Sequence, residues 1–159
     1  MVSARKQPNS RHCFGCGIEN PVGLRLKFLQ ISDEEIRSEF TPPSQYEGFP
    51  GVLHGGVIAT ALDETCARAL IGVDTPRFMY TARLDIRFRK PVPVGTTLSL
   101  VGKAGRSRGH SAESWAGLYG PDGELLAEAN AVLIDIPETT FPNAELEQLG
   151  WKVYPEAWE

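Results

Sequence analysis

The sequence predicts an α+β fold in which an antiparallel sheet curls around a single long helix. One segment, residues 57–71, is apolar around most of a helical circumference, so it belongs inside a domain. Segments on both sides of it alternate between apolar and polar side chains, as strands do when one face is buried. Because one helix cannot cover both faces of a sheet, a doubly wound α/β fold is excluded.

The helix follows a His-Gly-Gly turn at residues 54–56 and carries few polar side chains. At about 100° per residue, Thr60, Glu64 and Arg68 fall on one narrow polar stripe, with Asp63 at its edge. Asp63 is thus a carboxylate in mostly apolar surroundings, behind a glycine-rich helix N-terminus. This combination indicates a catalytic site.

The expected strands are separated by turns rich in proline, glycine and aspartate. The first two form a hairpin, and the later ones follow the helix with short joins. A short helix is expected at residues 144–149, and residues 104–109 either extend a strand or form a turn. The expected strands are residues 24–31, 36–40, 78–89, 96–103, 110–119 and 125–136.

Length and composition predict one domain of an ordinary globular protein. The chain has 159 residues and a formal net charge of -4, which argues against nucleic acid as a partner. No apolar run reaches the roughly 18 residues of a membrane span, and residues 1–10 do not resemble a secretory signal. We therefore expect a cytoplasmic protein with a flexible tail over 1–11, a domain over 12–136, and a C-terminal extension over 137–159. The extension is expected to dock on the domain or on a partner subunit.

Three cysteines, an odd number, do not form a disulfide framework and suit a reducing compartment. Cys13 and Cys16 form a Cys-x-x-Cys pair, but zinc needs about four ligands and the sequence offers no second pair. His12 is a candidate third ligand, and Cys66 falls within the helix. The pair is therefore interpreted as a structural loop, and no metal site is predicted.

Four further stretches, which together span most of residues 12–136, are informative as a set. They are Cys-Phe-Gly-Cys-Gly with Asn-Pro-Val-Gly-Leu at 13–24, Gly-Val-Leu-His-Gly-Gly followed by Leu-Asp-Glu at 51–64, the strand at 81–92, and Gly-Pro-Asp-Gly to Ala-Glu-Ala at 120–129. In this order they resemble the hotdog-fold acyl-CoA thioesterases, in particular the PaaI-type branch near 4-hydroxybenzoyl-CoA thioesterase.

The resemblance implies a hotdog fold and an obligate homodimer, in some relatives a tetramer, with active sites between subunits. It implies that Asp63 is the catalytic nucleophile or general base and that the Gly55 N–H polarises the thioester carbonyl. It also implies that His54 positions the turn, and that Thr81 of the neighbouring subunit holds the attacking water. No metal or organic cofactor is implied. Some relatives carry an asparagine where this chain has Gly48, a role that Gln45 or water would have to fill.

Further candidates concern the binding of coenzyme A. Arg89 and Lys90, and likewise Arg106 and Arg108, are basic pairs suited to its phosphates, or else solvated strand ends. Gly56 lets a substrate approach the backbone at the helix N-terminus.

Glu64 is a rival carboxylate for the substrate site. Its spacing of four residues from Arg68 also suits a structural ion pair.

Three functions remain open from the sequence. The first is an acyl-CoA thioesterase, and the second is a non-catalytic module that binds acyl-CoA on the same fold. A hydratase or dehydratase is the third, but this chemistry calls for an aspartate and a histidine acting together, and the sequence offers no second histidine suitably placed.

Overall fold

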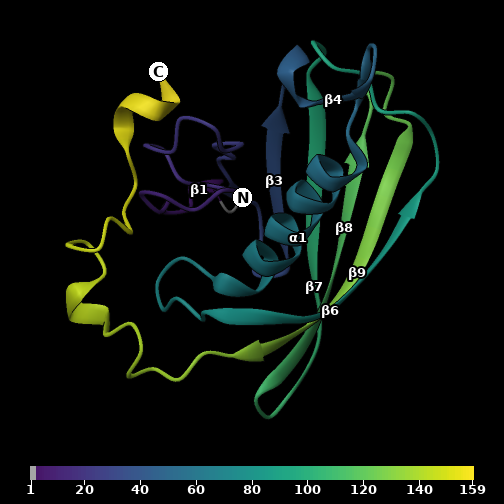
Figure 1. Ribbon diagram of the computed structural model, residues 1–159. Helices are drawn as coiled ribbons and strands as arrows, with labels where there is room; N and C mark the ends of the chain where they lie inside the picture. The colour runs from purple at the N-terminus through teal and green to yellow at the C-terminus, as the bar shows by residue number, and fades with distance from the viewer. Residues whose placement is uncertain (1–2) are drawn as a thin grey trace.

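The computed structural model describes residues 3–159 as a seven-stranded antiparallel sheet with one long helix packed on it (Figure 1). The strands lie in the order β1-β2-β3-β7-β8-β9-β6. Their bounds are β1 Arg5–Lys6, β2 Leu29–Gln30, β3 Glu35–Phe40, β6 Met79–Phe88, β7 Leu98–Arg108, β8 Ser111–Tyr119 and β9 Leu125–Asp135. The predicted α+β arrangement is confirmed.

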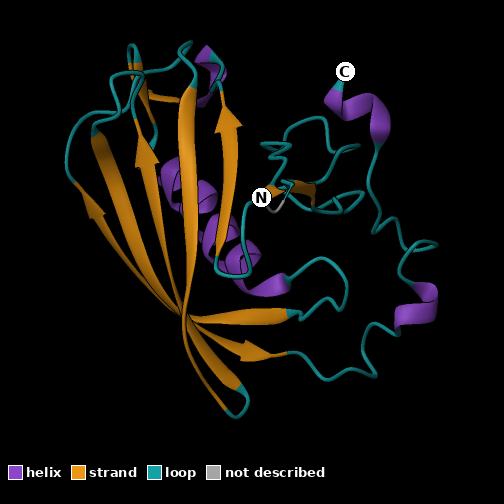
Figure 2. Cartoon of the chain, turned by 180° about the vertical axis from the view of Figure 1, so that it is seen from behind, coloured by secondary structure: helices purple, strands orange, loops and turns teal. Residues whose placement is uncertain are grey.

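Helix α1, Gly55–Ile71, crosses one face of the sheet, as Figure 2 shows from behind. Its buried side chains recur every three or four positions, which places them on the side that meets the strands. Along the strands that face the helix, buried residues tend to alternate with more exposed ones. The core between the two layers includes Ile58, Ala61, Leu62, Cys66 and Ala69 of the helix and Leu98, Leu100, Ala116, Leu118, Ala129 and Leu133 of the sheet.

Two smaller elements deliver the chain to the helix. A 3-10 turn, η1 at Ser44–Tyr46, precedes a two-stranded sheet made of β4, Glu47–Phe49, and β5, Val52–Leu53. Of the two alternatives for residues 104–109, the structure shows the strand extension, since β7 continues to Arg108 through an irregularity between Ala104 and Ser107.

The predicted first strand, residues 24–31, is wrong over most of its length. Only Leu29–Gln30 pair with β3, although Leu24 and Leu26 are buried as the alternation requires. The N–H groups of Leu24 and Leu26 donate to the carbonyls of Phe14 and Gly15 instead. The alternating pattern therefore serves packing against a loop rather than pairing in the sheet.

The part of the expected N-terminal tail that the structure describes packs on the domain. β1 pairs with β2, and the Gln7 and Asn9 side chains are 0% and 1% exposed. The Asn9 amide donates to the carbonyls of Cys16 and Leu26, both at 2.8 Å. These buried contacts fix residues 5–9, so the tail prediction does not hold for them.

The C-terminal segment passes beside the N-terminal one (Figure 1). Asn9 bridges Lys152, and the Trp151 ring lies over the Arg68 guanidinium. Two 3-10 turns interrupt this segment, η2 at Asn143–Glu145 and η3 at Pro155–Trp158, in place of the helix expected at 144–149. Within residues 3–159, no helix combines the length and the apolar character that crossing a membrane requires.

Candidate active site

The helix N-terminus presents a backbone N–H to the surface. His54 caps the helix, and its Nδ1 accepts a hydrogen bond of 2.9 Å from the Gly56 N–H. Gly55 is the first helical residue, so its N–H has no acceptor within the helix, and the residue is exposed. The positive end of the helix dipole lies at the same place. The Gly55 N–H is therefore available to a ligand, whereas the Gly56 N–H is used by the cap.

Asp63 lies half-buried in the middle of α1 and faces β6. Its Oδ1 accepts a hydrogen bond of 2.7 Å from the Thr81 hydroxyl. Thr81 and Asp63 of one chain are thus already in contact, so a site that takes Asp63 from a neighbouring subunit takes Thr81 from the same subunit. Helix and strand are packed together, and this packing holds the carboxylate in one orientation.

Gly55 and Asp63 are too far apart to act together within one chain. They stand eight positions apart on α1, which corresponds to about 12 Å along the axis at 1.5 Å per residue. An aspartate side chain is much shorter than this. A carbonyl bound at the Gly55 N–H would therefore not be reached by the Asp63 carboxylate of the same copy.

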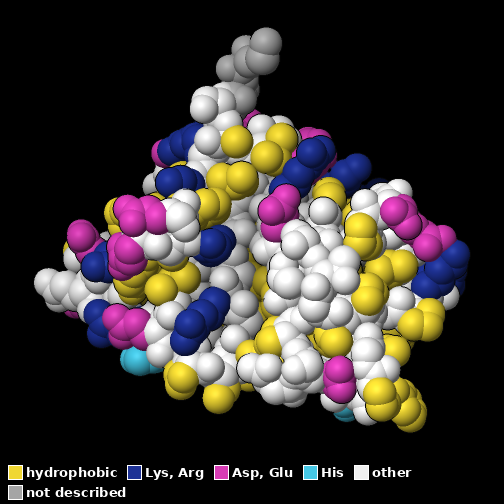
Figure 3. Space-filling view, turned by 90° about the horizontal axis from the view of Figure 1, so that it is seen from above, with side chains coloured by type: hydrophobic (Ala, Val, Ile, Leu, Met, Phe, Trp, Pro, Cys, Tyr) yellow, Lys and Arg dark blue, Asp and Glu magenta, His cyan; other side chains and the backbone are white. Residues whose placement is uncertain are grey.

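A groove of about 600 Å³ opens beside the helix N-terminus. Its lining combines backbone, apolar and basic groups, and includes Phe49, His54, Gly55, Phe88, Arg89 and Lys90. Figure 3 looks onto this end of the molecule, where apolar side chains are interspersed with Lys and Arg and with Asp and Glu. The fold thus brings the predicted pair Arg89 and Lys90 to the predicted helix turn.

The two basic side chains of the groove are held in surface ion pairs. Arg89 Nε lies 2.7 Å from Glu128 Oε2, and Lys90 pairs with Glu124. The hydrogen bond from Arg89 lowers the pKa of Glu128 below its ordinary value. Arg89 and Lys90 are 40% and 55% exposed, so these pairs contribute little to stability and leave both cations accessible.

Arg106 and Arg108 lie at the other end of the sheet. Arg108 of β7 lies opposite Ser111 of β8, which in turn lies opposite Ile134 of β9. Phe88, at the end of β6, lies opposite Ala127 of β9. Ile134 and Ala127 are seven positions apart on β9, or about 23 Å. Within one chain, therefore, Arg106 and Arg108 do not join Arg89 and Lys90.

Comparison with known proteins places this arrangement in a family. The family model described as the thioesterase superfamily matches residues 50–127, the stretch that holds α1, its histidine cap, Thr81 and the basic pair of the groove. The chain belongs to the thioesterase superfamily. Bovine acyl-coenzyme A thioesterase THEM4 is 33% identical over 82 residues, which are 51% of this chain and 32% of that protein. The chain spans half or less of the length of the curated relatives that it matches.

Solved structures support the same superfamily. The crystal structure of RHA08564, a thioesterase superfamily protein, superimposes with a TM-score of 0.71 at 27% identity, over 79% of this chain and 61% of that one. The PaaI protein of E. coli has a TM-score of 0.62 at 15% identity, over 70% of this chain and 83% of PaaI, and so shows a shared fold. The predicted hotdog fold is confirmed.

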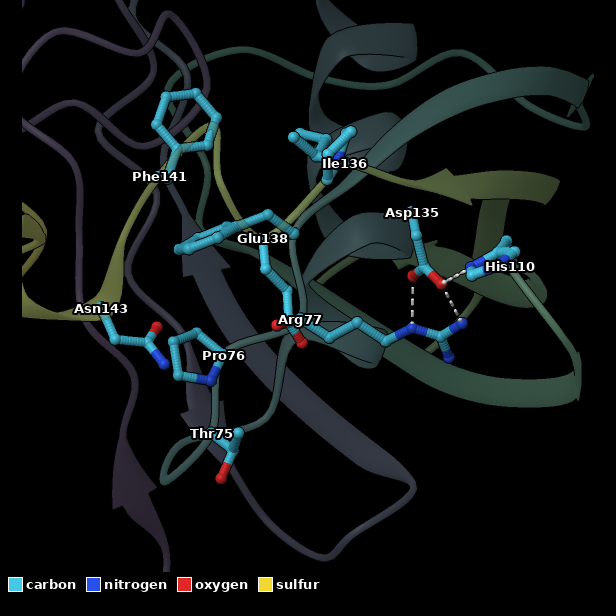
Figure 4. A pocket seen from close by; sticks show the side chains of 11 residues that line it. Thr75, Pro76, Arg77, His110, Asp135, Ile136, Glu138, Phe141 and Asn143 are labelled. Carbon is cyan, nitrogen blue, oxygen red and sulfur yellow. Dashed lines mark hydrogen bonds and ion pairs between the residues drawn. The ribbon is translucent and has the colours of Figure 1, made fainter.

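A second cavity, of about 830 Å³, contains none of the predicted thioesterase residues (Figure 4). Arg77 lines this cavity, and its guanidinium donates to both carboxylate oxygens of Asp135, at 2.6 and 3.2 Å. His110 Nδ1 lies 3.5 Å from the same carboxylate. The hydrogen bond from Arg77 lowers the pKa of Asp135, so both charges are already paired. This cluster ties the loop after α1 to the end of β9.

Gly48, the position at which the resemblance led us to expect an asparagine, also lines the groove. A Cβ at position 48 would stand 3.2 Å from the His54 Cα, so a side chain there would press on the helix cap. Gln45 is exposed in η1 and is not part of the groove lining. The groove of this chain is therefore built for a glycine at position 48.

Glu64 forms the ion pair with Arg68 that the spacing predicts. Arg68 Nε lies 3.0 Å from Glu64 Oε1, and the arginine side chain is only 1% exposed. Burial raises the pKa of Glu64 to about 7, against the opposing effect of the Arg68 charge. Glu64 thus points away from the groove and toward the N-terminal loop, where the Cys13 Sγ lies 3.7 Å from Oε2. The sequence gives no sign of this last contact.

Proposed function

We propose that the protein hydrolyses an acyl-CoA thioester to free coenzyme A and a carboxylic acid. The observation that supports this most is the presence, on one helix, of two groups that thioester hydrolysis needs. Its N-terminus offers an unused N–H at Gly55, and its middle carries the Asp63 carboxylate held by Thr81. Relatives named acyl-coenzyme A thioesterase support the same reaction class.

Each of these two groups has a separate role in the reaction. Hydrolysis builds negative charge on the thioester oxygen, and a preorganised N–H donor stabilises that charge. Asp63 either accepts a proton from the attacking water or attacks the carbonyl itself. His54 acts indirectly, because its hydrogen bond to the Gly56 N–H keeps the Gly55 N–H directed outward.

The separation along α1 leads us to propose that one site is shared by two copies of the chain. In a symmetric dimer with antiparallel helices, Gly55 of one copy can face Asp63 of the other. β6 supports this assembly, because it ends the sheet and its outer edge has no strand partner within residues 3–159. Tyr80 and Phe88 on this strand are 60% and 55% exposed, and a long uncovered edge strand invites pairing.

Arg89 and Lys90 are proposed to bind the phosphates of coenzyme A. They flank the helix N-terminus in the same groove, and Phe49 and Phe88 offer apolar surface beside them. Because their ion pairs with Glu128 and Glu124 are exposed, a phosphate can compete for the same cations at small cost.

The test is thiol release from a panel of short, long and aromatic acyl-CoA esters. Asp63→Asn keeps an oxygen that accepts from Thr81 but removes the base, so we expect turnover to fall by about 10²–10⁴. Asp33→Asn is the matched control, since Asp33 is an exposed carboxylate in the turn between β2 and β3, at the opposite edge of the sheet from β6, and it should keep full activity.

Two other outcomes would change the conclusion. Turnover that survives in Asp63→Asn would remove Asp63 from the chemistry. Saturable binding of acyl-CoA without turnover by the unmodified protein would favour the non-catalytic binding module.

A further inference from the structure

Three potential metal-binding atoms meet away from the proposed active site. They are the sulfurs of Cys13 and Cys16 and a carboxylate oxygen of Glu64, and all lie within 4.8 Å of one another. Both thiols are free, and Cys16 is buried. The sequence offers only two of these ligands side by side. The fold supplies the third, because the loop that carries the cysteines packs against the polar stripe of α1.

The loop around the two sulfurs directs a backbone donor at Cys13. The Gly15 N–H donates to Cys13 Sγ at 3.3 Å, and this bond favours the Cys13 thiolate, the form that binds a metal. The Ser10 hydroxyl lies 3.4 Å from Cys16 Sγ, where either atom can be the donor.

Two glycines make room for this arrangement. A Cβ on Gly15 would stand 2.7 Å from Glu64 Oε2, and a Cβ on Gly17 would stand 2.4 Å from the Cys13 carbonyl oxygen. Any larger residue at position 15 would therefore push the carboxylate away from the sulfurs. The close approach of Glu64 depends on glycine here.

The charges of the cluster also balance around a divalent cation. Two thiolates, the Glu64 carboxylate and the Arg68 guanidinium sum to -2, because Arg68 contributes one positive charge beside Glu64. Arg68 is 1% exposed, so the cluster lies in a buried place. The two thiols therefore lose their protons only as the dication binds, because uncompensated charge there is costly.

We propose that Cys13, Cys16 and Glu64 form a binding site for a thiophilic divalent cation of the zinc type. Tetrahedral zinc with Zn–S of about 2.3 Å and Zn–O of about 2.1 Å separates sulfur from oxygen by about 3.6 Å. The Cys13 thiol donates a hydrogen bond to Glu64 Oε2 at 3.7 Å, so the two atoms already stand at the separation that a shared zinc ion requires. The half-exposed side of Cys13 leaves the fourth position to water. Binding exchanges the two thiol protons for the cation, so no oxidant or reductant takes part.

The site would fasten the loop at 12–17 to α1 next to Asp63. Its ligands come from two segments far apart in the sequence, and a cation bound by the native state alone stabilises that state by mass action. This effect does not depend on thioesterase activity, so binding and stability test it separately from the proposed reaction.

The experiment is a titration of the reduced, metal-free protein with Co²⁺, whose thiolate complexes absorb light where the aqueous ion does not. We expect saturation at one equivalent with thiolate charge-transfer bands, and displacement of Co²⁺ by Zn²⁺. Cys13→Ser and Cys16→Ser should each abolish the two-thiolate spectrum. Glu64→Gln should weaken binding by at least about tenfold while both sulfurs remain.

Cys66→Ala is the matched control, because it removes the third, buried thiol and leaves the cluster intact. It should bind Co²⁺ as the unmodified protein does. Zn²⁺ should also raise the melting temperature of the unmodified protein and of Cys66→Ala, but not that of Cys13→Ser.

Three results would overturn the proposal. The first is the absence of thiolate bands in the reduced, folded protein, a result that depends on no variant. The second is Co²⁺ binding that Cys13→Ser and Cys16→Ser leave unchanged. The third is a Cys13–Cys16 disulfide that forms readily in air, together with no metal binding after reduction, which would identify a redox pair instead.

Discussion

Replacing Gly55 by proline removes the proposed carbonyl donor and leaves the helix in place. Gly55 is the first residue of α1, where proline is well tolerated because that N–H has no partner in the helix. His54 has φ −60° and ψ 136°, the extended conformation that a residue before proline prefers. The substitution therefore changes one N–H and little else. Loss of one such donor costs about 10²–10³ in kcat, or about 2.7–4 kcal/mol of transition-state stabilisation.

The control for this prediction is Gly55→Ala. A Cβ at position 55 would lie 3.7 Å from the Phe88 ring, an ordinary van der Waals contact, and the N–H would remain. Steady-state thiol release should show kcat reduced in the proline variant with little change in KM, and near wild-type rates in the alanine variant. Circular dichroism should show the same helix content in both. Equal kcat in the proline variant and the unmodified protein would refute the donor role of the Gly55 N–H.

Three further predictions concern the side chains of Thr81, Lys90 and Asp135. Thr81→Val removes the hydrogen bond to Asp63 and should lower kcat by about tenfold, since hydrogen bonds to charged groups are worth about 1.5–3 kcal/mol, while Thr81→Ser should retain most activity in the same assay. Lys90→Ala should raise the KM for acyl-CoA with little effect on kcat, and the difference should shrink in high salt. Asp135, whose pKa is lowered by Arg77, stabilises the fold above the pKa that it has in the unfolded chain, and this contribution is lost as the pH falls through its folded pKa. Asp135→Asn should therefore reduce the acid dependence of the melting temperature, and an unchanged pH profile would count against the ion pair.

Local periodicity predicts the fold of this chain well where elements are long. The helix and the four long strands β6 to β9 carry their patterns over nine residues or more, so their burial shows in the sequence. The helix cap is also local, because His54 reaches the Gly56 N–H two residues away. These features need no knowledge of distant contacts.

What the sequence does not reveal depends on segments that meet from far apart. Arg68 belongs to a polar stripe that would ordinarily face water, yet Pro8 and Trp151 cover it from the two ends of the chain. The meeting of Cys13 with Glu64 arises in the same way. Alternation in the segment 24–28 is compatible with pairing in the sheet and with packing against a loop. Hydrogen bonds to the backbone carbonyls of residues 14 and 15 select the loop.

The measurement that tests the shared site most directly uses a heterodimer. Copies carrying Asp63→Asn and copies carrying Gly55→Pro, with different affinity tags, are co-expressed and the mixed dimer is isolated. Each parent homodimer should be nearly inactive. A site that joins Gly55 of one copy to Asp63 of the other is intact once per mixed dimer, so we predict about half of the wild-type activity. A mixed dimer as inactive as its parents, or a protein that stays monomeric while it turns over thioester, would contradict the shared site.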